Sequence, residues 1–294
     1  MMKRGGQKAL GDSLHCYYEW QTNQTSERGR FGFGMVTNHS FNAHWHTAME
    51  FAYIIEGEVL ACVDEEQYHA HAGDIILCGR DQIHYMNSLE SGSKMVLLIF
   101  DPDYVQEALL GRQFAITFLN AAKVRELNMP PETFREIQHC FTVLPYIKEN
   151  RYEGYLSLCE NYLKLIIALL MRYVPLKEDD VDNRISSTVK IMQHAIDYII
   201  ENYSENLTLE QLARNFYISP FYLSRLFGKY VGVPFKKYLN HVRVTEAINL
   251  MMATTNSIQS IAQNCGFNNI RTFNRVFKEY TQMTPKAYIK ARRS

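Results

Sequence analysis

The chain has 294 residues, in which 31 Lys and Arg side chains balance 31 Asp and Glu, and 47% of the residues are hydrophobic. This composition is typical of globular proteins with about two domains, and it excludes disordered, collagenous and coiled-coil chains. The most apolar stretch, LKLIIALLM, is far shorter than the ~20 residues that cross a bilayer. It predicts a core helix and no membrane partner.

The amino-terminal stretch MMKRGGQKALGD has basic residues without an apolar segment after them, so we expect no secretion and a cytoplasmic location. The six cysteines form no Cys-x-x-Cys pair and have no regular spacing, which disfavours a disulfide framework and a zinc ribbon. We expect reduced thiols, most of them buried, at Cys16, Cys62, Cys78, Cys140, Cys159 and Cys265.

Charge is distributed unevenly along the chain. Residues 1–182 carry 16 basic and 25 acidic side chains, whereas residues 183–294 carry 15 basic and 6 acidic ones. A compact segment with such a basic surplus is typical of proteins that bind phosphates. The charge distribution alone is equally consistent with a solvated basic face that has no function.

In chain order, the first hundred or so residues contain short β-rich runs, among them FAYIIEG, EVLACVD, HAGDIILCG and KMVLLIF. They predict an antiparallel barrel or sandwich. From about Pro102 to Val174 apolar residues recur three and four positions apart, which predicts two or more helices. The polar, acidic stretch from Pro175 to Asn183 predicts a linker, and we place the domain boundary after residue 182.

Beyond the linker every predicted element is a helix. VKIMQHAIDYII is the first, and Thr208, Ser219 with Pro220, and Ser257 are capping residues ahead of later ones. LSRLFGKY and FNRVFKEY repeat one pattern of apolar residues, Arg, Phe and Tyr at an offset of 50 positions. The segment is therefore predicted to contain two copies of one helical unit.

Each copy has the features of a helix-turn-helix motif. A short helix with a small residue, Ala213 or Ala262, precedes a tight turn and a second helix, and Ala lets two helices cross closely. The turn of the second copy is one residue longer, around Asn268. Between the copies, Phe235 to Ala253 predicts a helix of about 28 Å, which suits major grooves that recur every ~34 Å.

Once the apolar positions are assigned to the core, the other side chains of each second helix are predicted to contact DNA. Arg and Asn recognise guanine and adenine edges through paired hydrogen bonds, each worth ~1–3 kcal/mol of discrimination. Pairing of Arg225 or Arg275 with acids of their own domain is a weaker alternative, because residues 206–294 contain only three acidic side chains, Glu210, Glu246 and Glu279. Either arginine could still meet Glu210 or Glu246. The predicted contact residues are Ser219, Phe221, Tyr222, Ser224, Arg225 and Lys229 in the first copy and Asn269, Ile270, Arg271, Asn274, Arg275 and Lys278 in the second.

These residues resemble the AraC/XylS family of bacterial transcriptional regulators. The resemblance lies in LEQLARNFYISPFYLSRLFGKYVGVPFKKYL, in RVTEA of the linker helix and in SIQSIAQNCGFNNIRTFNRVFKEYTQMTPKAYI. It implies binding to promoter DNA, usually with transcriptional activation through contact with RNA polymerase. Two positions depart from the family pattern. Tyr217 lies where the turn commonly has Gly, so it either strains the turn or stacks on the domain, and Thr281 with Gln282 replaces the usual Gly before the final Pro.

The amino-terminal part has its own motifs, HWHTAME, followed after six residues by Gly57, and GDIILCGRDQIH. If the first motif lies on or near a strand, His44, His46 and Glu50 point to the same side, and His84 can join them from a neighbouring strand. Three imidazoles and a carboxylate suit a divalent metal ion such as Zn, Mn, Fe or Ni.

Both motifs resemble those of the cupin barrel. Metal-dependent cupins use the equivalents of the three histidines and the glutamate as ligands, whereas regulators often keep these residues as the polar lining of an effector pocket. The second motif lacks the usual Pro and inner Gly, with Gly79 and Asp81 here, and its closing Asn87 comes one position early.

Two further surfaces are candidates for binding. Trp45, Tyr53 and Tyr85 lie near the histidine motif, and aromatic rings in barrel mouths hold flat or sugar-like ligands. Strand alternation points Trp45 away from the histidines, so packing beneath the helices is an alternative for it. The apolar helices at residues 152–174 are a candidate homodimer surface, or they only cover the barrel.

The sequence thus predicts an α+β protein of two domains. Residues 1–182 form a cupin-like antiparallel β-barrel with flanking helices that senses an effector and dimerises, and residues 183–294 form an all-α DNA-binding domain with two helix-turn-helix motifs joined by a linker helix. The chain contains no Ser-His-Asp or Cys-His constellation, Walker loop or dinucleotide fingerprint, so we expect a regulator and not an enzyme. A metal-dependent cupin oxygenase or isomerase with a helical DNA-binding appendage, and a non-specific architectural DNA protein, are the alternatives.

Overall fold

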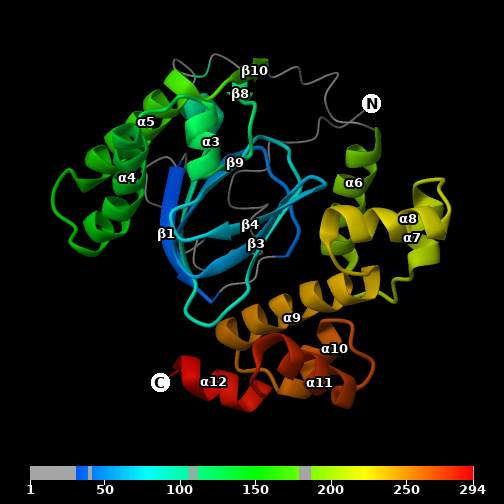
Figure 1. The fold of residues 1–294 in the computed structure, drawn as a ribbon. Coiled ribbons are helices and arrows are strands. Elements are labelled where there is room, and N and C mark those ends of the chain that lie inside the picture. Colours follow the sequence, from blue (N-terminus) through cyan, green and yellow to red (C-terminus); the bar gives the residue numbers. More distant parts are fainter. Residues whose placement is uncertain (1–30, 39–41, 106–108, 110–111, 179–186, 294) are drawn as a thin grey trace, which may run out of the picture. The chain divides into compact units, whose positions relative to one another are not determined.

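The computed structural model describes residues 31–38, 42–105, 109, 112–178 and 187–293. The chain divides into two compact units, residues 1–185 and residues 186–294. The described part of the first unit combines antiparallel sheets with helices, and that of the second is helical (Figure 1). The predicted boundary after residue 182 falls among residues 179–186, which lie outside the described residues.

The first unit contains three antiparallel sheets, with strand orders β1-β7-β2-β5-β9, β4-β3-β6 and β10-β8. The predicted runs correspond to β2, β3, β5 and β7, and further strands lie between them. The strands are β1 (Phe31–Thr37), β2 (Met49–Glu56), β3 (Glu58–Val63), β4 (Glu66–His71), β5 (Ile75–Cys78), β6 (His84–Ser88), β7 (Lys94–Phe100), β8 (Arg112–Phe114), β9 (Phe118–Leu119) and β10 (Leu176–Glu178).

The five-stranded sheet is buried on both faces. Phe51 of β2 packs with Phe141 in the cluster that includes the helices, whereas Ile54 packs with Val59 in a second cluster shared with the three-stranded sheet. Burial on both faces explains why β2 and β7 read as continuous apolar runs. The five-stranded and three-stranded sheets face each other, and the described strands do not close into one hydrogen-bonded ring, so the cupin-like domain is not the closed barrel that we predicted.

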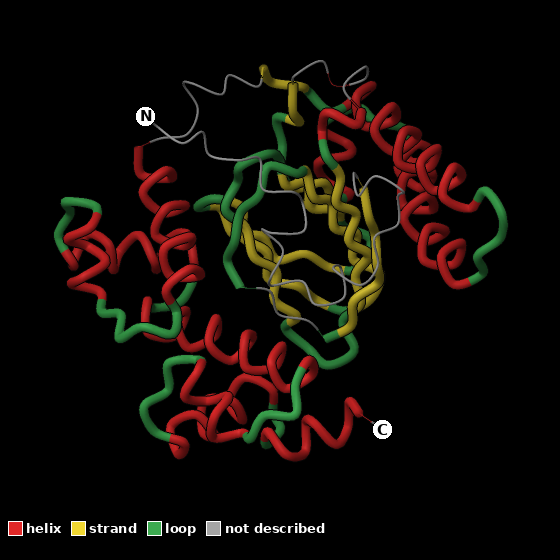
Figure 2. Tube along the Cα trace, turned by 180° about the vertical axis from the view of Figure 1, so that it is seen from behind, coloured by secondary structure: helices red, strands yellow, loops and turns green. Residues whose placement is uncertain are grey.

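Helices cover one face of the five-stranded sheet in both views of the chain (Figures 1 and 2). They are α3 (Ala121–Glu126), α4 (Pro131–Glu149) and α5 (Tyr155–Tyr173), after a short 3-10 helix at Pro102–Val105. None of the described helices is long and apolar enough to cross a membrane.

Two predicted boundaries in this unit are wrong. The region from Pro102 is not helical throughout, because β8 and β9 come between the 3-10 helix and α3. The first part of the predicted linker is β10, in which Leu176 pairs with Phe114 of β8. Strands of two or three residues are too short to produce a period in the sequence, and only their hydrogen-bond partners reveal them. The described cysteines, from Cys62 to Cys265, are buried free thiols as predicted, and Cys16 lies outside the described residues.

The second unit contains the two predicted helix-turn-helix motifs and the linker helix, α9, with the bounds that the sequence predicts. Thr208 and Gln211 form a capping box at α7, and Ser219 and Ser257 cap α8 and α10. The elements are α6 (Ser187–Asn202), α7 (Leu209–Asn215), α8 (Pro220–Leu226), a π-helical turn at Phe227–Val231, α9 (Phe235–Ala253), α10 (Ile258–Asn264), α11 (Ile270–Thr281) and α12 (Pro285–Arg293).

Helix α9 belongs to the cores of both motifs. Near its start, Phe235 and Tyr238 lie against Phe227, with ring centroids 5.7 and 6.0 Å apart. Towards its end, Ala247 and Met251 are buried in the cluster of the second motif. The linker helix is therefore a shared structural element, not only a spacer.

Arg243 of α9 connects three parts of this unit. Its side chain is 5% exposed, and Nε and Nη2 donate hydrogen bonds of 2.7 Å each to the carbonyls of Tyr203 and Glu205, just after α6. Its guanidinium lies over the ring of Phe267 in the turn of the second motif, 5.7 Å from the centroid. In that turn Gly266 has φ +77°, and a Cβ there would lie 2.7 Å from the Ser204 carbonyl oxygen. The segment after α6, the linker helix and the second motif are thus held in one close contact.

We expect Arg243→Met to lower the free energy of unfolding of the helical unit by about 2–4 kcal/mol, because two carbonyl groups lose their partners at ~1–3 kcal/mol each. Urea titration of the whole chain measures this. Both tryptophans, Trp20 and Trp45, belong to residues 1–185, so fluorescence follows the first unit while far-UV circular dichroism also reports the second. The exposed Arg225, changed to Met, is the matched control. Equal stability of the two variants would contradict the role of Arg243.

Both departures from the family pattern lie in left-handed backbone. Tyr217 has φ +55° and Gln282 has φ +58°, while the corresponding residues of the other copy, Gly266 and Gly232, have φ +77° and +72°. A residue with a Cβ is strained there by roughly 1–2 kcal/mol. Because Tyr217 is 98% exposed, its ring does not stack on the domain, and of the two alternatives for this residue the strained turn is the one found.

We expect Tyr217→Gly to raise the free energy of unfolding by up to about 1 kcal/mol, since relief of strain exceeds the extra chain entropy that Gly brings to the unfolded state. Phe221→Gly, another exposed aromatic residue but inside α8, should lower it by about the same amount. Thermal unfolding followed by circular dichroism compares the two. A loss of stability in both variants would show that residue 217 is not strained.

Candidate metal centre and nucleic-acid interface

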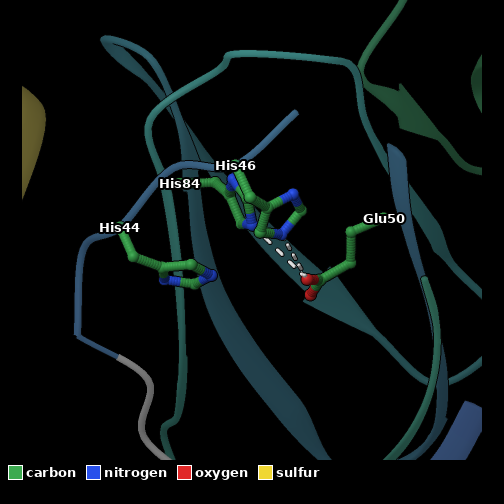
Figure 3. A group of neighbouring side chains, drawn as sticks. All are labelled: His44, His46, Glu50 and His84. Atoms are coloured by element: carbon green, nitrogen blue, oxygen red, sulfur yellow. Dashed lines mark hydrogen bonds and ion pairs between the residues drawn. The ribbon is translucent and has the colours of Figure 1, made fainter. Parts of the chain in front are cut away.

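Four buried side chains converge between the two facing sheets. Glu50 lies on the same face of β2 as Ala52 and Ile54, which pack towards the three-stranded sheet, and His84 shares a face of β6 with Met86 in the same cluster. Each sheet therefore contributes a polar group to the space between them (Figure 3).

His44 and His46 reach this space from the segment just ahead of β2, so they lie near a strand but not on one. An isolated antiparallel bridge positions His44 beside His84: His44 N–H donates to the His84 carbonyl at 3.0 Å, and His84 N–H to the His44 carbonyl at 2.9 Å. The structure thus brings the four predicted residues together. The cause is the backbone bridge between His44 and His84 and not the alternation of side chains along one strand.

The four side chains are compact and almost inaccessible to solvent, with exposed fractions of 1–5%. One potential ligand atom from each lies within 4.8 Å of all the others. Nε2 of His46 and of His84 lies 3.3 and 3.4 Å from Glu50 Oε2.

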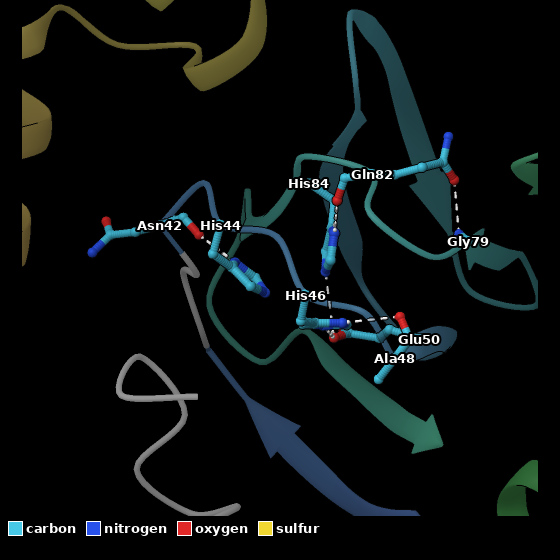
Figure 4. Close-up of polar contacts among 8 residues, drawn as sticks. All are labelled: Asn42, His44, His46, Ala48, Glu50, Gly79, Gln82 and His84. Atoms are coloured by element: carbon cyan, nitrogen blue, oxygen red, sulfur yellow. Dashed lines mark hydrogen bonds and ion pairs between the residues drawn. The ribbon is translucent and has the colours of Figure 1, made fainter. Parts of the chain in front are cut away.

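Each imidazole is oriented by a backbone carbonyl (Figure 4). Nδ1 of His44, His46 and His84 lies 2.7, 3.0 and 2.9 Å from the carbonyl oxygens of Asn42, Ala48 and Gln82. A carbonyl only accepts, so each Nδ1 carries a proton and Nε2 is left as the nitrogen that can bind a metal ion. Histidine ligands in metalloproteins are oriented in this way by an outer hydrogen bond.

The electrostatics of the cluster favour a bound cation. Burial by itself would raise the pKa of Glu50, but its hydrogen bonds with His46 and His84 outweigh burial and hold that pKa well below the ordinary value. Burial likewise opposes protonation of His84, yet the Glu50 carboxylate raises its pKa. Burial, and then the neighbouring imidazoles, lower the pKa of His44. An ionised carboxylate that faces imidazole lone pairs requires protons or a metal ion between them, and the set of three nitrogens and one oxygen fits Zn, Fe, Mn or Ni.

Of the aromatic residues near this motif, Tyr53 packs against Phe141 of α4, with centroids 5.6 Å apart, and Tyr85 is buried beside Gln67, whose amide donates to its hydroxyl at 3.1 Å. Both take part in packing.

The second helices of the two motifs expose equivalent faces. The burial pattern of residues 221–229 is repeated residue for residue at 271–279, with Leu223 and Phe227 inside the first copy and Phe273 and Phe277 inside the second. All the side chains predicted to contact DNA are exposed.

Some of these side chains also have a structural role. Ser219 and Asn269 cap α8 and α11, because their side-chain oxygens accept from Tyr222 N–H at 3.1 Å and Arg271 N–H at 2.7 Å. Lys229 lies in the π-helical turn and not in α8, which ends at Leu226.

Arg275 does pair with an acidic residue of its own domain, which was the alternative to DNA contact, although with neither Glu210 nor Glu246. Its Nη1 lies 3.3 Å from Oε2 of Glu279 on the same helix.

A hollow at the start of α11 was not predicted from the sequence, because it forms only where the turn and two helices come together. It is lined by Gln259, Ala262, Gln263, Phe267, Asn268, Asn269 and Ile270.

Comparison with known proteins assigns both units. Residues 30–154 match the AraC-like ligand binding domain, and residues 212–291 match a helix-turn-helix domain. The chain belongs to the AraC/XylS family of transcriptional regulators. Its amino-terminal unit is the ligand-binding domain of that family, with a cupin-like fold.

Relatives with known names include other AraC/XylS-type regulators. The regulatory protein PocR of Salmonella typhimurium is 34% identical over 139 residues, which cover 44% of this chain and 46% of PocR. The lactose operon transcription activator of Staphylococcus xylosus is 22% identical over 240 residues, 80% of this chain and 81% of the activator. The crystal structure of ToxT from Vibrio cholerae is 16% identical, with a TM-score of 0.44 over 88% of this chain and 97% of ToxT. The chain spans about half the length of PocR.

Proposed function

We propose that the chain is a sequence-specific DNA-binding transcriptional regulator of promoters, located in the cytoplasm with the chromosome, and that it is not an enzyme. The observation that carries this proposal is the pair of second helices with the same buried and exposed pattern, each presenting an exposed arginine at the same position, Arg225 and Arg275. Family membership and the basic surplus of residues 183–294 support it.

The two arginines suit guanine recognition. A guanidinium binds O6 and N7 of guanine with two hydrogen bonds, worth ~1–3 kcal/mol of discrimination. The pair of Arg275 with Glu279 is exposed on both sides, at 69% and 61%, and such surface pairs are worth only about 0.3–0.5 kcal/mol. The free-energy cost of separating Arg275 from Glu279, so that the arginine can bind a guanine edge, is therefore small.

The amino-terminal unit is proposed to bind a small-molecule effector. Similarity to a lactose operon transcription activator supports a sugar as the effector. The ligand acts by binding more tightly to one of two arrangements of the regulator, since equal affinity for both would shift nothing. Contact with RNA polymerase then makes promoter occupancy productive.

We propose in addition that the chain is a homodimer. Leu165 of α5 is 37% exposed, and Tyr146 of α4 and Tyr152, in the loop between α4 and α5, are 66% and 53% exposed. The proposed surface between the two copies consists of the helices at residues 152–174 and the end of α4. The exposure of these apolar side chains supports it.

His44, His46, Glu50 and His84 are proposed to bind one divalent metal ion. The ion supplies the positive charge that a buried carboxylate needs and occupies the lone pairs of three oriented imidazoles. Because Glu50 and His84 come from the two facing sheets, these side chains would then hold the sheets together at one point of the effector domain.

We expect the chelator-treated chain to bind about one Zn²⁺, Mn²⁺ or Ni²⁺ and to unfold at a higher temperature when metal is added, by about 2.7 kcal/mol of stability at a hundredfold excess over Kd. Glu50→Gln and His84→Gln should reduce the affinity at least ~100-fold, because each removes a direct ligand and even outer partners are worth 10–100-fold. His71→Gln changes an exposed histidine and is the control. Metal content that is the same in all three variants would exclude this site.

We expect Arg225→Ala and Arg275→Ala to relax base preference, each losing ~1–3 kcal/mol on selected sites and much less on random sequence. Genomic footprinting supplies the sites, and competition binding at several salt concentrations measures the preference. Arg135→Ala removes an exposed arginine of the first unit and should change nothing.

The same competition experiment separates the alternatives. Equal weakening on all sequences as salt rises would identify a non-specific architectural protein. Absence of any preference for genomic fragments, combined with metal-dependent turnover, would identify an enzyme.

A further inference from the structure

The two recognition helices differ at several equivalent exposed positions, and at one of them an apolar ring in the first copy corresponds to a cation in the second. Phe221 occupies the second position of α8 and Arg271 the second position of α11, fifty residues later in the same repeat. Four positions later on the same face both copies carry an arginine, Arg225 and Arg275. The two copies thus share this arginine, whereas the ring of Phe221 in one copy corresponds to the guanidinium of Arg271 in the other.

Phe221 contributes little to the stability of the fold. Its side chain is 73% exposed, while the neighbouring Leu223 is fully buried. Residues three and four positions apart lie on the same helix face, so Phe221 shares its face with Ser224 and Arg225. The ring of Phe221 is therefore free of the core and available for contact with a bound molecule.

The surroundings of this ring are suited to DNA. Residues 211–245 contain no Asp or Glu, and five of their six Lys and Arg side chains are exposed, all except the buried Arg243. The basic side chains suit the phosphates of DNA. The major groove also presents an apolar group, the 5-methyl of thymine, which the ring can contact. DNA therefore accounts for both the charge and the exposed ring of this face. Phenylalanine cannot form hydrogen bonds with base edges, so this methyl is the feature of the groove that it can recognise.

We propose that Phe221 recognises the methyl group of a thymine in one half of the binding site, and that Arg271 recognises a guanine at the equivalent base of the other half. Arg225 and Arg275 read the same base in both halves. The two half-sites are then related but not identical, and the difference fixes which helix-turn-helix motif occupies which half. This inference rests on the proposed sequence-specific binding to DNA.

The test uses modified oligonucleotides of a selected site. Deoxyuridine replaces each thymine in turn, which removes only the methyl group, and 7-deazaguanine replaces each guanine, which removes the N7 acceptor. One deoxyuridine in the half-site of the first motif should weaken binding by the unchanged chain about fourfold, the equivalent of one buried methyl group. One 7-deazaguanine in the other half-site should weaken it by about fivefold or more.

Variants assign each effect to a side chain. Phe221→Ala should lose the sensitivity to deoxyuridine, and Arg271→Ala the sensitivity to 7-deazaguanine. Tyr217→Ala removes another exposed ring, from the turn before α8, and should keep both. All three residues are exposed, and circular dichroism checks that the variants fold.

Exchange of the two side chains gives the sharpest result. Phe221→Arg should change the preferred base in the first half-site from thymine to guanine, and Arg271→Phe should make the reverse change in the second, each by about fivefold or more.

The inference is overturned if deoxyuridine at no position affects binding, or if Phe221→Ala keeps the sensitivity. It is also overturned if Phe221→Ala lowers transcription while DNA affinity stays the same, because the ring then contacts another protein. These outcomes all leave a sequence-specific binder, and they differ from failure of the proposed function, in which the unchanged chain prefers no sequence.

Discussion

Arg243 is the side chain on which the arrangement of the helical unit depends. It is a buried cation without a carboxylate partner among its hydrogen bonds; two backbone carbonyls and an aromatic ring stabilise it instead. Carbonyl groups have fixed positions on the backbone, so a guanidinium bound to them also fixes the segment to which they belong. The result is a defined relation between the end of α6, the linker helix and the turn of the second motif, and the exposed face of α11 follows from that relation.

The effector-binding unit depends on a comparable constraint. An ionised glutamate from one sheet lies among three histidines, one of which belongs to the facing sheet, and all four are buried. A charge in such a place is stable only when opposite charge accompanies it. The proposed metal ion would supply this charge, and because the cluster contains side chains from both sheets, such binding would act directly on the packing of the two sheets.

The repeat in the second unit shows how one fold can present two different exposed faces. The buried positions are the same in both copies because both must pack on α9, and substitution there would disturb the fold. The exposed positions have no such restriction, so Phe221 and Arg271 differ although they occupy the same place. The strained backbone at Tyr217 has the same origin, since the turn geometry is set by packing whichever residue occupies it.

Elements that have a clear period or a capping signal could be predicted from the sequence. The repeat at 50 positions, the bounds of the linker helix and the exposed faces of the second helices follow from local patterns of apolar residues, because a helix face is defined by spacing alone. The amino-terminal motifs also predicted which side chains would meet. Tertiary structure alone decided how they meet: His44 is positioned by a single bridge to His84, and the imidazoles by backbone carbonyls that have no side-chain signature. The separation of the predicted barrel into two facing sheets, the short strands β8 to β10 and the contact of Arg243 with Tyr203 are of the same kind, since each depends on hydrogen bonds between residues far apart in the chain.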